Sequence, residues 1–169
     1  ATQLPLPIRA VLVGAIVIPK AIYACSATPC GKKALKSIRA AAAKAIWGQR
    51  NSWRAPEILF TLMCKGHVAD PWQVSSYLTL LTARKILQRQ PQVRETYQET
   101  LAMRRDENGR PRPLFWKGPV AALLQACDLA NLTLEPDGVT VYHLQENDVG
   151  ELGTIHLIEG DNSNFAHVV

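Results

Sequence analysis

Positively charged side chains recur at helical spacing between residues 32 and 44. Lys32, Lys36 and Arg39 stand at positions i, i+4 and i+7, so they form one stripe on a helix, and Lys33 and Lys44 widen it. Such side chains bind phosphate oxygens through charge-assisted hydrogen bonds. This spacing favours contact with the backbone of a nucleic acid, without readout of its base sequence.

Aromatic and basic residues alternate directly after this stripe, at Trp47, Arg50, Trp53 and Arg54. Arginine pairs with phosphate while tryptophan stacks on a base or sugar, so the combination suits nucleic acid. Alternatively, both tryptophans fill the core, which we expect for Trp47 because it ends a packed helix. The candidate nucleic-acid-binding residues are Lys32, Lys33, Lys36, Arg39, Lys44, Arg50, Trp53 and Arg54.

The common sequence motifs of catalysis are absent from the chain. It contains no Gly-rich phosphate loop, no His-Glu-x-x-His and no Gly-x-Ser-x-Gly. No two aspartates are adjacent, and the four histidines are scattered. Because catalysis needs reactive groups with supporting geometry, we expect no catalytic residues, no cofactor and no enzyme activity from this chain alone, although convergent sites need no motif.

Four cysteines are irregularly spaced, and most of them lie in apolar stretches. We expect thiols rather than disulfides, as in a reducing intracellular compartment. The alternative is a zinc site formed by Cys25, Cys30, Cys64 and His67, because Cys-x4-Cys and Cys-x2-His place pairs of ligands within reach of one ion. The two pairs are far apart in the sequence and lack knuckle-like turns, so we expect no bound metal.

The chain has 19 Lys and Arg against 14 acids, a formal charge of +5 that favours an anionic partner but is also common in soluble domains. The apolar run from Ala10 to Ile18 is far shorter than the roughly 20 residues of a membrane span. We therefore expect no membrane partner, and the cysteines favour a location in the cytoplasm or nucleus. The alternative is a secretory signal peptide, since Arg9 precedes this run. The start at Ala1 suggests a piece of a longer or processed protein.

The elements that must position these residues are mostly helices, according to the spacing of apolar residues, prolines and glycines. We expect helices over 7–23, 29–47, 56–65, 71–87, 93–105 and 119–131. The first is apolar on nearly all sides, with a kink at Pro19, and is expected in the centre of the core. The second should begin at Thr28 as N-cap and end before Gly48. The fourth should begin at Asp70 as N-cap, followed by Pro71.

The C-terminal part changes character after an exposed loop rich in charge, Gly and Pro. Residues 132–135 and 139–144 alternate with period two around the turn residues 136–138, which predicts a hairpin. The predicted fold is mainly α, a bundle of about six helices with a small C-terminal β-hairpin. We divide it into a helical domain over 1–105, a loop over 106–115 and an appendage over 116–169.

Several short motifs between Leu4 and Leu87 resemble the segment that follows the catalytic palm in reverse transcriptases of retrotransposons lacking long terminal repeats. They are Leu4-Pro5 with Arg9, Ile18-Pro19-Lys20-Ala21-Ile22-Tyr23, Leu35-x-x-Ile38-Arg39 with Ile46-Trp47-Gly48, Arg54-Ala55-Pro56-Glu57-Ile58-Leu59, and Gly66-His67-Val68-Ala69-Asp70-Pro71. The resemblance implies a thumb, a helical subdomain that packs on the template-primer duplex (RNA/DNA or DNA) beside an upstream palm. The aromatic-x-Asp-Asp metal motif of the palm is missing here.

Three functions therefore remain open, and the third of them, a stand-alone enzyme or a secreted protein, would require a catalytic site or a cleavage that the sequence does not show. The first is a thumb-like module that grips nucleic acid, with the lysine stripe toward phosphates and Leu35, Ile38 and Ile46 toward the core. The second is a protein-interaction module, in which an apolar groove between helices binds a partner and the positive charge is incidental.

Overall fold

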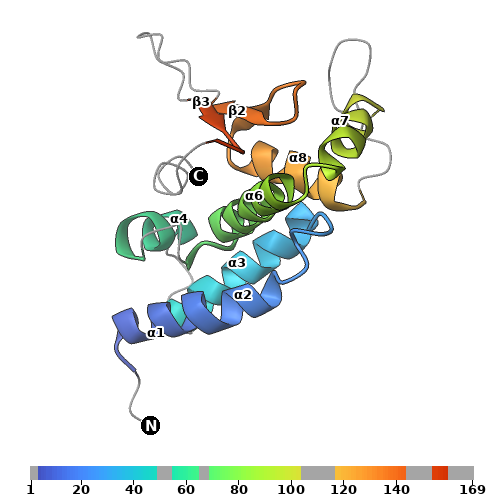
Figure 1. Ribbon diagram of the computed structural model, residues 1–169. Coiled ribbons are helices and arrows are strands. Elements are labelled where there is room, and N and C mark those ends of the chain that lie inside the picture. Colours follow the sequence, from blue (N-terminus) through green and yellow to red (C-terminus); the bar gives the residue numbers. More distant parts are fainter. Residues whose placement is uncertain (1–3, 49–54, 65–68, 104–116, 144–153, 160–169) are drawn as a thin grey trace. The chain divides into compact units, whose positions relative to one another are not determined.

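The computed structural model describes residues 4–48, 55–64, 69–103, 117–143 and 154–159. The chain forms two compact units, a first unit of residues 1–25 and 30–75 and a second unit of residues 26–29 and 76–169. The predicted loop over 106–115 lies outside the described residues, and the units divide elsewhere, within the helix that begins at Pro71. Figure 1 shows the predominance of helices, which confirms the predicted fold class.

The N-terminal helix of the first unit consists of α1 (Leu6–Leu12), a π-helical turn η1 (Val13–Val17) and α2 (Ile18–Ala21). Pro7 lies in the first turn of α1, as predicted. Pro19 has no N–H group and its ring collides with the carbonyl of the preceding turn, so the helix widens into η1 just before it. The predicted irregularity at Pro19 therefore takes the form of a π-helical turn.

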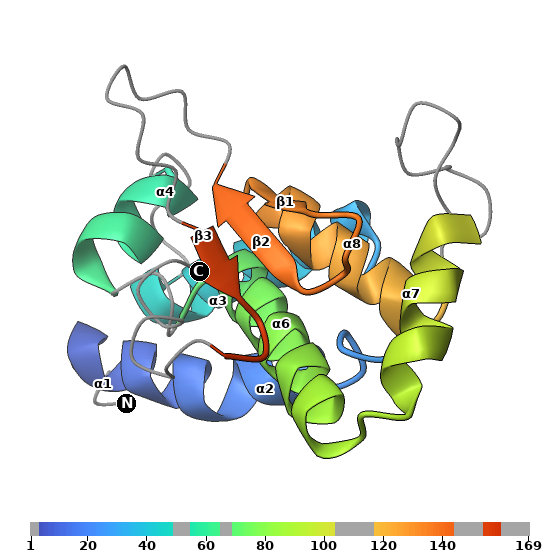
Figure 2. The same ribbon diagram turned by 45° about the horizontal axis from the view of Figure 1, so that its top comes forward.

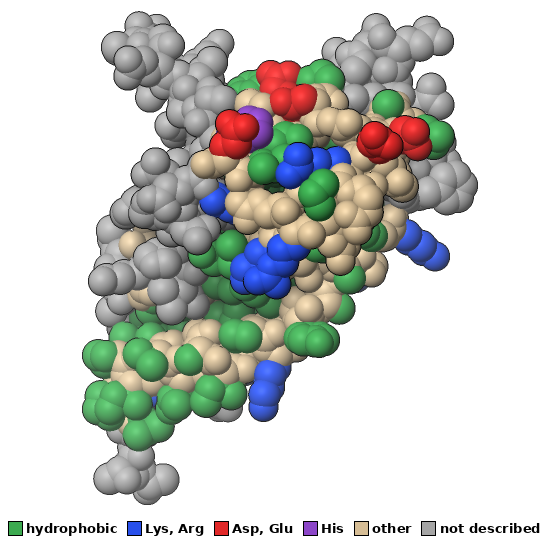
Figure 3. All heavy atoms as spheres, viewed as in Figure 1, with side chains coloured by type: hydrophobic (Ala, Val, Ile, Leu, Met, Phe, Trp, Pro, Cys, Tyr) green, Lys and Arg blue, Asp and Glu red, His purple; other side chains and the backbone are tan. Residues whose placement is uncertain are grey.

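The N-terminal helix packs along α3 (Lys32–Trp47), but only one of its faces is buried. Ile18 and Ile22 are inside, whereas Ile8, Val11 and Ile16 are 47%, 64% and 49% exposed. The prediction of a central core helix was therefore wrong for the residues described, because α3 covers one side only. In Figure 3, hydrophobic side chains gather on the surface over α1.

A shorter helical segment follows in the first unit, formed by α4 (Pro56–Ile58) and a second π-helical turn, η2 (Leu59–Met63). It begins at Pro56, as the sequence predicts. Leu59 and Phe60 are completely buried.

Three further helices, α6 (Pro71–Arg89), α7 (Val93–Met103) and α8 (Pro119–Leu129), follow in the chain. All three agree with the predicted helices to within a few residues. None of the helices among the described residues has the length and apolarity needed to cross a membrane.

The second unit also contains an antiparallel sheet in the order β1 (Leu132–Leu134), β2 (Thr140–His143) and β3 (Thr154–His156). The β1–β2 hairpin was predicted, whereas β3 was not. The sheet lies beside α8 (Figure 2), where Leu123, Cys127 and Val141 share one core with Leu80 and Leu101.

Candidate nucleic-acid interface

α3 carries most of the predicted binding residues. Its N-cap is Gly31 rather than Thr28, so the helix begins later than the sequence suggested, and it ends at Trp47, before the C-cap Gly48, as predicted. Gly48 has a φ of +91°, a conformation that glycine adopts without the steric cost of a Cβ. Of the three residues expected to face the core, Leu35 and Ile46 are completely buried and Ile38 is half-buried.

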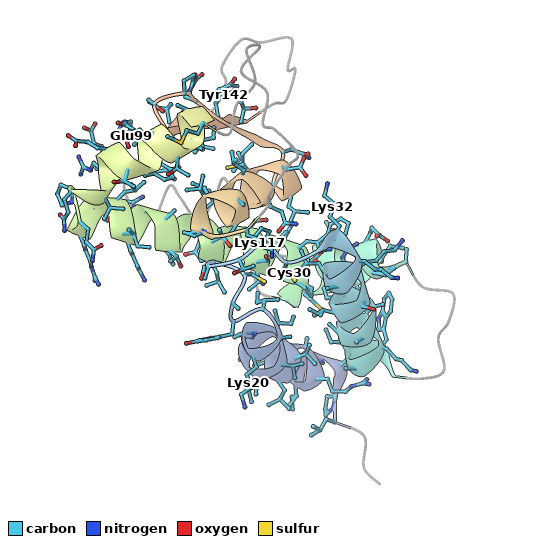
Figure 4. All side chains as sticks on the ribbon, turned by 90° about the vertical axis from the view of Figure 1, so that its right-hand side faces the viewer. Lys20, Cys30, Lys32, Glu99, Lys117 and Tyr142 are labelled. Atoms are coloured by element: carbon cyan, nitrogen blue, oxygen red, sulfur yellow. The ribbon has the colours of Figure 1, made fainter. Side chains whose placement is uncertain are left out.

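The opposite side of α3 is a solvent-exposed lysine face, which we define as Lys33, Lys36 and Lys44 together with the small residues Ser37, Ala40 and Ala41 between them. Lys33 and Lys44 are eleven residues apart, or about 16 Å along the helix axis. The small side chains leave the helix surface between the lysines open, so an extended anion could approach it there. Lys32 is also exposed and extends from the first turn of α3 (Figure 4).

The charge at the beginning of α3 opposes the dipole of the helix. Lys32 and Lys33 occupy its first turn, which contains no acidic residue, and Gly31 provides no side-chain cap. A cation at this end is unfavourable by about 0.3–1 kcal/mol, since the N-terminus of a helix is itself positive. Lys32 and Lys36 repel each other in addition, because they are four residues apart. An external anion near Lys33 and Lys36 would reduce this repulsion.

Arg39 does not belong to this lysine face. Its Nε lies 3.0 and 3.1 Å from the two carboxylate oxygens of Asp70, and its Nη2 lies 2.8 Å from Asp70 Oδ2. Its Nη1 donates a 2.8 Å hydrogen bond to Glu57. The side chains of Arg39 and Asp70 are only 15% and 7% exposed. The predicted stripe of Lys32, Lys36 and Arg39 therefore lacks its third member as an exposed cation.

Two aromatic rings complete the surroundings of the Arg39 guanidinium. Its carbon lies 5.4 Å from the centre of the Phe60 ring and 5.1 Å from that of Trp72, within the range of cation–π attraction. Asp70 also accepts a 3.1 Å hydrogen bond from the backbone N–H of Trp72 and so caps α6, as predicted. Arg39 thus links α3 to η2 and to the beginning of α6.

The remaining predicted residues, Arg50, Trp53 and Arg54, lie outside the described residues. Trp47 is half-buried, so it is neither fully inside the core nor fully exposed for stacking on a base.

Helical spacing alone does not reveal a stronger signal, which is the distribution of charge along the chain. Residues 1–56 contain no Asp or Glu. Their nine cations are Arg9, Lys20, Lys32, Lys33, Lys36, Arg39, Lys44, Arg50 and Arg54.

Residues 57–169 have the opposite balance, with the other 10 cations and all 14 acids. An unequal distribution of charge of this kind favours an anionic partner for the basic part. The lysine face therefore lies in a stretch whose positive charge is not offset by acids of its own.

Each of the four cysteines is a thiol rather than half of a disulfide. Burial raises the pKa of Cys127 to about 12, and burial together with the neighbouring Cys30 raises the pKa of Cys25 to about 11. Among the described residues, no group of three or more His, Cys, Asp or Glu is arranged to hold a metal ion. His67 of the alternative zinc set lies outside these residues.

Comparison with known proteins adds no assignment. No family model matches the chain, and neither a curated protein nor a solved structure is detectably similar to it.

Proposed function

We propose that the chain is a thumb-like nucleic-acid-binding module of a reverse transcriptase-like polyprotein in the cytoplasm or nucleus. The observation that carries this proposal is the lysine face of α3, on which Lys33, Lys36 and Lys44 flank small residues. A second support is the absence of acids from residues 1–56. The resemblance of residues 4–87 to the segment after the palm points to the same function.

The ligand that fits this face best is a duplex bound through its phosphates. Lysine is a flexible point charge, and the face has no arginine fork or amide to read a base edge. Binding is therefore nonspecific in sequence and weakens strongly with salt, because each phosphate contact releases counterions. Polymerisation belongs to a palm elsewhere in the parent protein, since this chain has no aromatic-x-Asp-Asp motif.

The test is a salt titration of the 169-residue chain on an RNA/DNA duplex. Three or four neutralised phosphates give a log–log slope of roughly −3 to −4. The variant K33Q/K36Q/K44Q is expected to flatten this slope by about 2 to 3 and to keep the helicity of the wild type.

The matched control is K20Q/K85Q/R89Q, which removes the same charge from exposed positions elsewhere. It should leave the slope within about 1 of the wild type. An unchanged slope in the first variant, or equal flattening in both, would refute the assignment to α3.

A protein-interaction module is the second candidate, favoured by the exposed face of Ile8, Val11 and Ile16. An apolar face of this kind is usual where a partner covers it. Partner binding through this apolar face would be insensitive to salt. The variant I8Q/V11Q/I16Q would abolish partner binding, because it removes the apolar contacts, and would leave the salt titration on the duplex unchanged. Retention of partner binding by this variant would exclude the face.

A further inference from the structure

The second unit contains a cavity of about 390 Å³ between α6, α7 and the beginning of α8. Its volume lies at the lower end of the range for small-molecule sites. The cavity shares no residue with the lysine face, because all of its lining residues belong to the second unit. What it binds is therefore independent of the proposed function.

The walls of the cavity are mainly apolar. Ile86, Val93, Val120 and Leu123 line it, and Ile86 is 40% exposed although it is a large hydrophobic residue. A molecule in the cavity would remove this apolar surface from water, which favours binding.

The threonines that line the cavity contribute less polarity than their number suggests. Thr82 and Thr100 donate their hydroxyl hydrogens to the carbonyls of Leu78 and Thr96, each at 2.7 Å. These hydroxyls are therefore already engaged within their own helices. A ligand must consequently be held mainly by apolar contact.

One end of the cavity is positively charged. Lys117 and Gly118 line it just before α8, and Lys117 lies beside the start of that helix (Figure 4). The first turn of α8 contains no acidic residue, and its N-cap Gly118 gives no side-chain hydrogen bond. None of the residues that line the cavity is acidic. The lysine and the positive helix end therefore favour an anionic group at this wall.

We propose that this cavity binds a small organic anion with an apolar body, such as an aromatic or branched aliphatic carboxylate or sulfonate. The body occupies the space between Ile86, Val93 and Leu123. The anionic group lies at Lys117 and at the backbone N–H of Val120, which is the first N–H of α8 because Pro119 has none.

Two fluorescent probes test both halves of the proposal on the full chain. 1-Anilinonaphthalene-8-sulfonate has an aromatic body and one anionic group, and N-phenyl-1-naphthylamine has a similar body without charge. We expect the anionic probe to bind 1:1 with a dissociation constant on the order of tens of micromolar, and the neutral probe several-fold more weakly.

Three variants separate the contributions. A83L and T96L place larger side chains into the cavity and should weaken both probes at least about tenfold. K117Q should weaken the anionic probe by roughly three- to tenfold and leave the neutral probe unchanged. K85Q is the control, since Lys85 is an exposed cation of α6 that does not line the cavity.

The fold of each variant is checked by circular dichroism and thermal melting. If A83L unfolds, T96L retains the test, because Thr96 is exposed on α7. Probe-induced amide shifts in two-dimensional NMR spectra should centre on Ala83, Thr96 and Gly118.

Wild-type binding in both cavity variants, or shifts centred on Ile8 and Val11 instead, would overturn the site. Equal weakening of both probes by K117Q would overturn the anionic part of the proposal. Absence of 1:1 binding to the wild type would overturn the whole.

Discussion

Replacement of Arg39 by methionine should destabilise the chain strongly, although Arg39 looks like a surface cation in the sequence. Methionine retains apolar contact with Phe60 and Trp72 but leaves the carboxylate of Asp70, 7% exposed, without its counter-charge. Loss of one partner of a buried ion pair costs about 3–5 kcal/mol. We therefore expect R39M to lower the free energy of unfolding by that amount.

The size of the Arg39–Asp70 interaction follows from a double-mutant cycle. D70N keeps an oxygen to cap the N–H of Trp72 but removes the charge, so we expect a smaller loss of about 1.5–3 kcal/mol. In R39M/D70N no buried charge remains. The double variant should then be more stable than the sum of the single losses implies, by about 2 kcal/mol.

The assay is urea denaturation, followed in parallel by circular dichroism and by tryptophan fluorescence, because Trp72 stacks on the guanidinium. E57Q is the control, since Glu57 contacts the same arginine but its side chain is 63% exposed. The free energy of unfolding of E57Q should stay near that of the wild type. A loss below about 1 kcal/mol in R39M would refute this reasoning. Arg39 would then be available for phosphates, as its spacing with Lys32 and Lys36 first suggested.

Three other perturbations test the second unit and the thiols. G138A should lower stability by about 2–4 kcal/mol in thermal denaturation, because Gly138 has a φ of +71° and an added Cβ would lie 2.7 Å from both Leu101 Cδ1 and Tyr97 Cε1; a wild-type melting curve would count against it. Burial tends to raise the pKa of Asp137, but hydrogen bonds from Thr140 and the backbone of Val139 outweigh it and lower this pKa below 3.8. This group therefore stabilises the fold above about pH 4, and the contribution is lost as the pH falls through the folded pKa, so the wild type should lose more stability in acid than D137N; identical acid profiles would contradict this. Iodoacetamide should alkylate Cys127 at least about 100-fold more slowly than an ordinary thiol, because its pKa of about 12 keeps it protonated, and rapid labelling seen by mass spectrometry would show that the residue is not buried.

Helix ends were predictable from the sequence because their signals are local. Asp70 and Pro71 act within one turn, and Gly48 needs no neighbour to adopt a positive φ. The N-terminus of α3 was misplaced because Thr28 and Pro29 resemble a cap, whereas the chain enters the helix at Gly31. The β1–β2 hairpin was predictable from its turn residues.

Tertiary pairing could not be predicted in the same way. The wheel of α3 placed Arg39 beside Lys36, yet its partner Asp70 is 31 residues away. Similarly, β3 follows β2 only after an intervening segment, and its three residues have too little alternation to be recognised. The exposure of Ile8 and Val11 depends on which neighbours cover them, which no local pattern encodes.

The repulsion between the lysines and the positive N-terminal end of α3 makes the stability of its first turn depend on a bound anion. Without a bound polyanion, Lys33 disfavours the first helical turn, so the amide hydrogens of this turn should exchange with solvent faster than those near Ala42 and Ala43. A polyanion that binds there stabilises the helical form, and by thermodynamic linkage the ordered turn binds the polyanion more tightly. The beginning of α3 is therefore expected to complete its folding on the ligand.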